Sequence, residues 1–196
     1  MWPFTGYDGG LISAVILAMP YGCLDSQKLS EASLKALENA LEWWRKSMQI
    51  SKPETFLVIA GYKESPEMEL QLRSEIVERR LSSEETSRHV ISITAKDEED
   101  LVQRIVRIHD LLPIESITVF AETRHALGIR PVFKRKFGKA LKIKTFRAEF
   151  EADHPWISTS SSITWLFWNA ILGLWFRIKK RMGRGLRKKM RYLFGP

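Results

Sequence analysis

The sequence of 196 residues contains one cysteine, Cys23, so it can form no internal disulfide and no zinc cluster built on several cysteines. It also lacks three common motifs: the GxGxxG of dinucleotide-binding folds, the GxxxxGK[ST] of P-loop enzymes and the GxSxG of α/β-hydrolases. Its four histidines are scattered, without HExxH or His-x-His spacing. These absences argue against a metal site, and no cofactor can be named from the sequence.

A secretory signal is not evident. The first ten residues contain no lysine or arginine, and the apolar stretch Leu11–Met19 has the length of a strand. The single cysteine favours a reducing compartment. The hydrophobic fraction of 44% and the charged fraction of 28% are typical of a soluble globular protein with a core of its own. We therefore expect a cytoplasmic chain.

Acidic residues are absent from residues 174–196, where nine basic residues are found. The whole chain has 31 basic and 23 acidic residues, so the part before this segment is close to neutral overall. Such asymmetry predicts a localised electrostatic role for the C-terminal segment. Its basic residues are Arg177, Lys179, Lys180, Arg181, Arg184, Arg187, Lys188, Lys189 and Arg191.

Apolar runs of strand length alternate with segments of helical periodicity. The predicted strands cover residues 11–18, 56–60, 90–94, 116–121 and 141–146. Helices are predicted from Ser30 to about Met48, from Ser65 with Met68, Leu72 and Ile76 inward, from Asp97 to Leu112, and over 130–137. Alternation without hairpin signals predicts parallel pairing through right-handed crossovers. The expected fold is a three-layer, Rossmann-like α/β domain with a mainly parallel sheet of about five strands.

Ligands of open parallel sheets bind outside the carboxyl ends of the strands. Here these ends carry glycine or polar residues, and a helix start at Ser65 could attract an anion. Each turn taken alone also fits an ordinary strand-to-helix connection. The candidate ligand-binding residues are Gly61, Tyr62, Lys63, Ser65, Lys96, Asp97, Glu122 and Arg124.

His125 is the candidate catalytic residue, because it follows a buried strand and lies beside Glu122 and Arg124. An imidazole there could act as a general acid or base, or bind a phosphate. The alternative is a surface histidine in a loop. The sequence leaves open whether the protein is an enzyme.

Four features resemble the SanA/ElyC/YdcF family of envelope-associated bacterial proteins over roughly residues 11–150. A first strand followed by a helix opens the domain, and the next strand ends in Ala60-Gly61-Tyr62, where the family usually has Ser-Gly-Gly. A polar helix start at Thr94–Asp100 follows a strand, and Val119–His125 runs into a Thr-x-His-like stretch. The resemblance implies a Rossmann-like fold, a role in the cell envelope and a small phosphorylated or nucleotide-like ligand near Gly61 and His125.

Residues 157–176 contain no charge, and their strongly apolar part, Ile163–Phe176, is too short for a typical membrane span. With the basic residues that follow, helical spacing predicts an amphipathic helix in an anionic bilayer surface. In the first interpretation, Ile163–Trp175 closes the domain core and the basic part lies on phospholipid headgroups. The expected membrane-binding residues are Trp168, Trp175, Phe176 and the nine basic residues named above. A spanning helix with the domain outside, a nucleic-acid-binding tail and a solvated basic helix remain alternatives.

The sequence thus predicts a Rossmann-like domain over residues 1–156 and an aromatic, basic helical segment over 157–196. We expect a protein at the inner face of the cell membrane that binds or processes a small phosphorylated, nucleotide-like or lipid-linked ligand. Its expected partners are an anionic phospholipid surface and that ligand. The alternative is a non-catalytic adaptor, or a nucleic-acid-binding protein, that docks through its basic tail.

Overall fold

The computed structural model describes residues 13–50, 54–62, 65–111, 114–151, 153–154 and 161–181. In these ranges the strands are β1 (Ser13–Ala18), β2 (Thr55–Tyr62), β3 (Val90–Ala95), β4 (Ile114–Glu122) and β5 (Leu141–Phe146). The helices are α1 (Glu31–Ile50), α2 (Pro66–Glu78), α3 (Ser83–His89), α4 (Glu98–Leu111), α5 (Thr123–Phe137) and α6 (Ser162–Arg181), with a 3-10 turn η1 (Gly138–Ala140).

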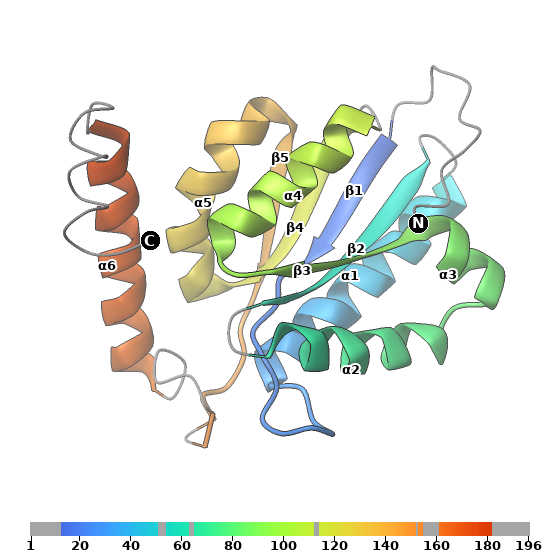
Figure 1. Ribbon diagram of the computed structural model, residues 1–196, viewed down its shortest axis with the longest axis horizontal. Coiled ribbons are helices and arrows are strands. Elements are labelled where there is room, and N and C mark those ends of the chain that lie inside the picture. Colours follow the sequence, from blue (N-terminus) through green and yellow to red (C-terminus); the bar gives the residue numbers. More distant parts are fainter. Residues whose placement is uncertain are drawn as a thin grey trace.

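The five strands form one sheet in the order β3-β2-β1-β4-β5, and neighbouring strands are parallel throughout (Figure 1). The predicted Rossmann-like α/β architecture is therefore confirmed. The chain builds outward from β1 in one direction through β2 and β3, and then in the other through β4 and β5. The strand order thus reverses between β1 and β4, which is where this type of sheet opens a crevice at its carboxyl ends.

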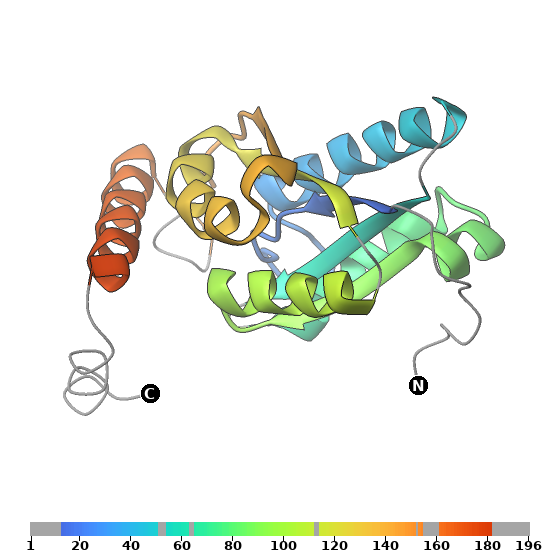
Figure 2. The ribbon, with the colours of Figure 1, turned by 90° about the horizontal axis from the view of Figure 1, so that it is seen from above.

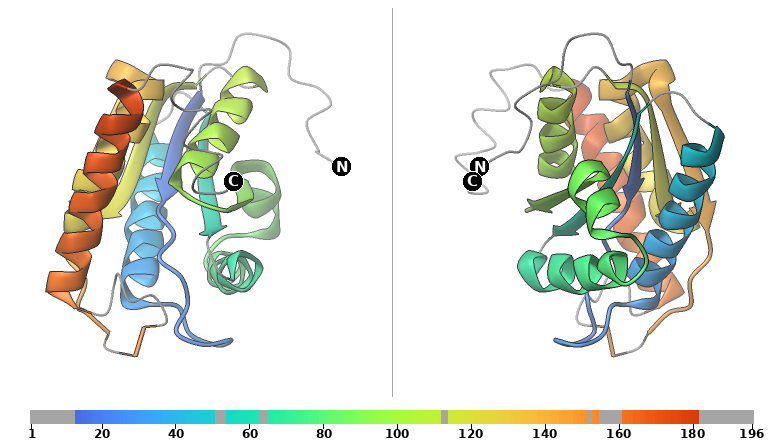
Figure 3. Two further views of the ribbon diagram at one scale, coloured as in Figure 1. Left: turned by 60° about the vertical axis from the view of Figure 1, so that its left-hand side comes forward. Right: turned by 90° about the vertical axis from the view of Figure 1, so that its right-hand side faces the viewer.

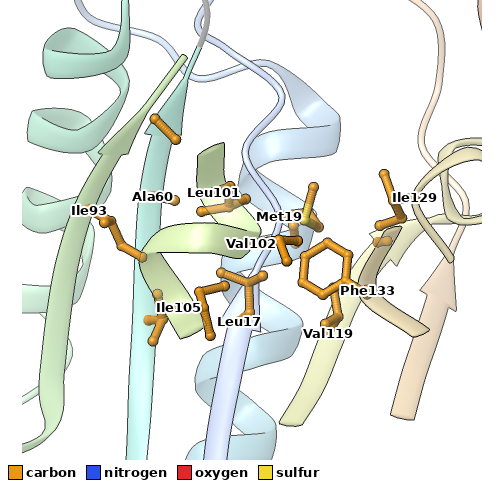
Figure 4. Packing of buried hydrophobic residues seen from close by; sticks show 14 of the residues in the cluster. Leu17, Met19, Ala60, Ile93, Leu101, Val102, Ile105, Val119, Ile129 and Phe133 are labelled. Atoms are coloured by element: carbon orange, nitrogen blue, oxygen red, sulfur yellow. The ribbon is translucent and has the colours of Figure 1, made fainter. Parts of the chain in front are cut away.

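Both faces of the sheet are covered, because alternate strand residues are apolar on both sides. Leu37, Leu41 and Trp44 of α1 pack with Ile16 and Leu57 on one face. On the other face, side chains of α4 and α5 pack against β1, β2 and β4 (Figure 4): Leu17, Met19, Ala60, Leu101, Val102, Ile105, Val119, Ile129 and Phe133. Viewed from above, α1 and α4 lie on opposite sides of the sheet (Figure 2). This gives the three layers that the alternation of elements predicts.

Helix α2 differs from its prediction in the face that it turns inward. Its start at Ser65 and Pro66 is confirmed. However, its buried residues are Glu69, Arg73 and Val77, whereas Met68 is exposed. Leu72 and Ile76 are only partly buried. The prediction of Met68, Leu72 and Ile76 as the inward stripe was wrong for Met68, because polar groups of the neighbouring loop draw Glu69 and Arg73 inward instead.

Two helices were missed or shortened in the sequence analysis. Helix α3 begins with a capping box, in which the Ser82 hydroxyl accepts from Glu85 N–H and the Glu85 carboxylate accepts from Ser82 N–H. Helix α5 starts at Thr123, well before the predicted Arg130, and continues through Pro131. A proline inside a helix loses one backbone hydrogen bond, and packing must offset that loss. The buried Ile129 and Phe133 hold the helix together across it.

Helix α6 lies on the outside of the molecule and packs against α5 (Figures 1 and 3). Trp165 is its buried anchor. The prediction that Ile163–Trp175 closes the domain core was wrong for the other large apolar residues of this stretch whose side chains the structure describes, because they are exposed on the side away from α5. The two helices run side by side in the same direction, so their C-terminal ends lie at the same end of the molecule (Figure 1). No helix in the described ranges combines the length and the hydropathy needed to cross a bilayer.

Gly61 is required by the close approach of α2 to the end of β2. A Cβ atom built on Gly61 would lie 1.9 Å from the carbonyl oxygen of Pro66. Backbone cannot move aside as a flexible side chain can, so a larger residue would have to push the first turn of α2 away. The glycine that the sequence analysis assigned to a ligand is therefore explained by packing.

Replacing Gly61 with alanine is expected to lower the free energy of unfolding by about 1–3 kcal/mol, because α2 must shift. Gly173→Ala in α6 is the control, since a Cβ there would meet nothing within 4 Å. Denaturant unfolding of both variants would check this. Equal stability of Gly61→Ala and the wild type would contradict the packing explanation.

Candidate functional site

The connection from β1 to α1 is held by a buried carboxylate from α2. Glu69 Oε1 accepts hydrogen bonds from the backbone N–H groups of Tyr21 and Gly22, both at 2.8 Å, and from the Ser33 hydroxyl at 2.6 Å. Its other oxygen accepts from Tyr62 N–H at 3.3 Å. Gly22 has a φ of 81°, which glycine adopts without strain. Glu69 thus satisfies donors that neither β1 nor α1 can serve.

Arg73 lies one helical turn after Glu69 and serves the acceptors of the same connection. Its guanidinium donates to the carbonyl oxygens of Ala18 and Met19, at 2.8 and 2.6 Å, and to the Ser33 hydroxyl at 2.6 Å. Its Nε atom is 3.5 Å from Glu69 Oε1, and both side chains are fully buried. Burial lowers the pKa of Arg73, and the charge of Glu69 opposes that shift. The two charges are therefore neutralised by each other and by the hydrogen bonds around them.

Tyr21 links this connection to the neighbouring side of the crevice. Its hydroxyl accepts a hydrogen bond from Glu122 N–H at 2.7 Å and lies 3.2 Å from His125 Nδ1. Either group can donate to the other, because the phenol oxygen also accepts and the role of Nδ1 depends on the tautomer of His125. Burial raises the pKa of Tyr21 well above its usual value of 10.0, which keeps the phenol protonated.

Glu98, in the first turn of α4, faces the other nitrogen of the same imidazole. Its Oε1 atom is 3.5 Å from His125 Nε2 and accepts a hydrogen bond from the Tyr62 hydroxyl at 3.3 Å. Burial is the main cause that raises the pKa of Tyr62, and the charge of Glu98 adds to it. The order Tyr21, His125, Glu98 is that of a hydroxyl, a base and an orienting carboxylate. Three polar side chains from three parts of the chain thus meet in one buried row.

The positive ends of two helices beside this row already hold carboxylates. Glu122 accepts from the N–H groups of Arg124 and His125 at the start of α5. Asp97 accepts from Asp100 N–H at the start of α4. A phosphate bound at either end would compete with the chain's own carboxylate. The positive ends of α4 and α5 are thus served within the fold, whereas the sequence analysis predicted an anion at the start of α2, at Ser65.

The crevice is covered by the chain that follows β5. His154 Nε2 donates to the carbonyl oxygen of Tyr21 at 2.9 Å. The ring of Trp165, from α6, lies 6.1 Å from the Tyr21 ring, measured between centroids. Arg124 lies over the rings of Phe150 and Trp165, and it donates to Glu122 at 2.8 Å and to the Ala148 carbonyl at 2.7 Å. Helix α6 is therefore joined to the crevice by direct contact.

The structure brings several predicted site residues together and separates others. His125, Tyr62, Glu122 and Arg124 lie in one cluster with Tyr21 and Glu98, and His125 is buried in the first turn of α5, not in a surface loop. Asp97 serves as a helix cap, and Lys96 is exposed beside it. Ser65 precedes α2 and makes no side-chain cap. Lys63 lies outside the described residues.

Sequence analysis missed Tyr21, Ser33, Glu69, Arg73 and Glu98 as members of this cluster. A signal was present in α2, where Glu69, Arg73 and Val77 recur every fourth residue and so share one helix face. A charged pair on the same helix face as a buried valine indicates that the pair is buried. However, Met68, Leu72 and Ile76 form an apolar stripe on a neighbouring face, and this stripe was predicted to face inward instead.

Among the described residues, no three His, Cys, Asp or Glu side chains are grouped so as to hold a metal ion. Comparisons with protein-family models, with curated proteins and with solved structures found no match for this chain. The resemblance to the SanA/ElyC/YdcF proteins thus stays a hypothesis that rests on the motifs quoted above.

Replacing Arg73 with methionine is expected to lower the free energy of unfolding by about 3–5 kcal/mol, because Glu69 is then left buried without its cation. The control is Arg80→Met, which removes a half-exposed ion pair with Glu38 and should cost about 1 kcal/mol or less. Denaturant unfolding measures both. A loss at Arg73 no larger than at Arg80 would show that the pair does not hold the β1–α1 connection.

Proposed function

We propose that this chain is a membrane-peripheral protein of cell-envelope metabolism, placed at the inner face of the membrane by α6 and the basic segment that follows it. At the carboxyl ends of its strands it binds or processes a small phosphorylated, nucleotide-like or lipid-linked ligand. The outward face of α6 is the single observation that carries the proposal.

That face is apolar, although it points away from the domain. Of thirteen large hydrophobic side chains that are exposed in the described part of the chain, eight belong to α6. Trp165, Asn169 and Gly173 are less exposed and recur every fourth residue, which marks the side toward α5. The outward residues are Ile163, Leu166, Phe167, Trp168, Ile171, Leu174, Trp175 and Ile178. A helix that turns its apolar side outward indicates a binding surface.

The charge that follows this face favours a lipid surface as its partner. Trp168 and Trp175, predicted to contact membrane, are 48% and 40% exposed. Tryptophan is enriched at membrane–water interfaces. Nine basic residues and no acidic one follow Leu174, and such clusters are attracted by anionic headgroups. The side chains of Phe176, Arg177, Lys179, Lys180 and Arg181, and all of residues 182–196, lie outside what the structure describes.

The row of Tyr21, His125 and Glu98 supports the ligand-binding part of the proposal. It lies where the strand order reverses, and both nitrogens of its histidine have polar neighbours in defined places. Trp165 joins it to the membrane-facing helix. A lipid-linked ligand would therefore meet the crevice close to the surface on which the protein lies.

Replacing Leu166, Phe167 and Leu174 together with glutamine is expected to weaken binding to anionic vesicles at least about tenfold, because three side chains no longer enter the apolar layer. The control replaces Met48, Ile50 and Met68, exposed apolar residues elsewhere, with glutamine. Co-sedimentation with phosphatidylcholine vesicles, with and without phosphatidylglycerol, measures the affinity. Equal binding of both variants, or retention of RNA and not vesicles by the wild type, would contradict the proposal.

The ligand-binding part predicts that a polyprenyl phosphate in vesicles, or a nucleoside monophosphate in solution, raises the midpoint of thermal unfolding. At a hundredfold excess over Kd the rise should be about 5 °C, because ligand binds only the folded state. His125→Gln should abolish the rise, and His109→Gln, in α4, should keep it. If neither compound shifts the wild type, or if His125→Gln responds fully, the crevice does not bind these ligands through His125.

A further inference from the structure

The chain contains a second acid-free basic segment, and it lies beside α6. Residues 130–147 hold eight basic residues and no acidic one. The part of the chain before residue 174 thus has a net charge near zero, but its positive charges are concentrated in this segment. Seven of the eight are exposed, and six of these lie on the second half of α5, η1 and the start of β5: Arg130, Lys134, Arg135, Lys136, Lys139 and Lys142. We name these six residues the α5 patch.

No acidic side chain neutralises the α5 patch within the described residues. None of its six members takes part in a salt bridge there, whereas exposed cations elsewhere do, as in Lys46–Glu42, Arg80–Glu38 and Arg88–Glu84. Cations in the last turn of a helix stabilise its negative end, and this accounts for one or two of Lys134, Arg135 and Lys136. It does not account for Arg130, Lys139 or Lys142, which lie outside that turn.

The position of the patch relates it to α6. Helices α5 and α6 are in contact and run in the same direction (Figures 1 and 3). The C-terminal turn of α5, with Lys134–Lys136, therefore lies at the same end of the molecule as the last turn of α6, where the basic run from Arg177 begins. The α5 patch therefore lies on the helix that packs against α6, toward the end of the molecule where α6 ends.

We propose that the α5 patch binds anionic phospholipid headgroups as the second part of the membrane-binding surface. This inference rests on the proposed function. The apolar face of α6 enters the bilayer boundary, and the patch binds the headgroups beside it. Two points of attachment fix the orientation of the domain, whereas α6 alone would leave it free to rotate about the helix axis. An outward apolar helix that packs against a helix with unpaired cations fits a lipid surface better than it fits nucleic acid, which has no apolar layer to receive α6.

The test replaces Lys134, Arg135 and Lys136 with glutamine in the full chain. The control replaces Lys28, Arg79 and Arg107, which are also exposed, with glutamine, so that both variants lose the same charge. Each basic residue close to an anionic membrane contributes about 1 kcal/mol, so the patch variant should bind phosphatidylglycerol-containing vesicles about a hundredfold more weakly than the wild type. Its binding should also depend less steeply on salt. The control variant should stay within about threefold of the wild type.

The outcomes separate this inference from the proposed function. If the α6 variant loses vesicle binding and the patch variant does not, the inference fails and the proposed function stands. If the wild type binds no vesicles, both fail. Equal losses in the patch and control variants would show an effect of net charge alone, and would overturn the inference. A patch variant that loses retention of an RNA oligonucleotide while keeping vesicle binding would overturn it as well.

Discussion

The buried pair of Glu69 and Arg73 is the interaction on which the crevice depends. A parallel sheet leaves backbone groups unpaired where β1 ends, and in this fold the same place must also position Tyr21. One carboxylate serves the donors of that connection and one guanidinium serves its acceptors. Because Tyr21 is held in this way, its hydroxyl meets both Glu122 and His125. Glu69 and Arg73 of α2 thus fix the position of Tyr21, although they do not belong to the row of Tyr21, His125 and Glu98.

The same row connects the core of the domain with its outer surface. Tyr21 contacts Trp165, and Trp165 is the residue that attaches α6 to the domain. The residues of α6 that point outward are large and apolar, which reverses the usual pattern of a surface helix. At the starts of α5 and α4, the carboxylates of Glu122 and Asp97 already accept hydrogen bonds from backbone N–H groups. The chain itself therefore occupies the positions where an anion would bind. A ligand would therefore have to displace part of what covers the crevice, which includes Arg124 and the α6 residue Trp165.

Much of this fold could be predicted from the sequence, because strands buried on both faces appear as continuous apolar runs, as in Phe56–Ala60. His125 and Glu122 were predicted from their place after β4. The inward face of α2 could not be predicted from hydrophobicity, since Glu69 and Arg73 are buried for their hydrogen bonds and not for their apolar surface. The start of α5 was predicted at Arg130, but the helix begins at Thr123, and packing of the buried Ile129 and Phe133 outweighs the bond lost at Pro131. The role of Gly61 depends on a contact with Pro66 that periodicity does not reveal.

The central claim is that the outward face of α6 lies in the boundary of an anionic bilayer. The most direct test is the depth of spin labels attached at Leu166, Leu174 and Ile178, with a label at Met48 as reference, in a chain in which Cys23 is replaced by serine. On anionic vesicles, the three α6 labels should become accessible to oxygen and protected from a water-soluble relaxation agent, while the label at Met48 stays in water. If the α6 labels keep the accessibility that they have in solution, α6 does not enter the membrane and the account is wrong.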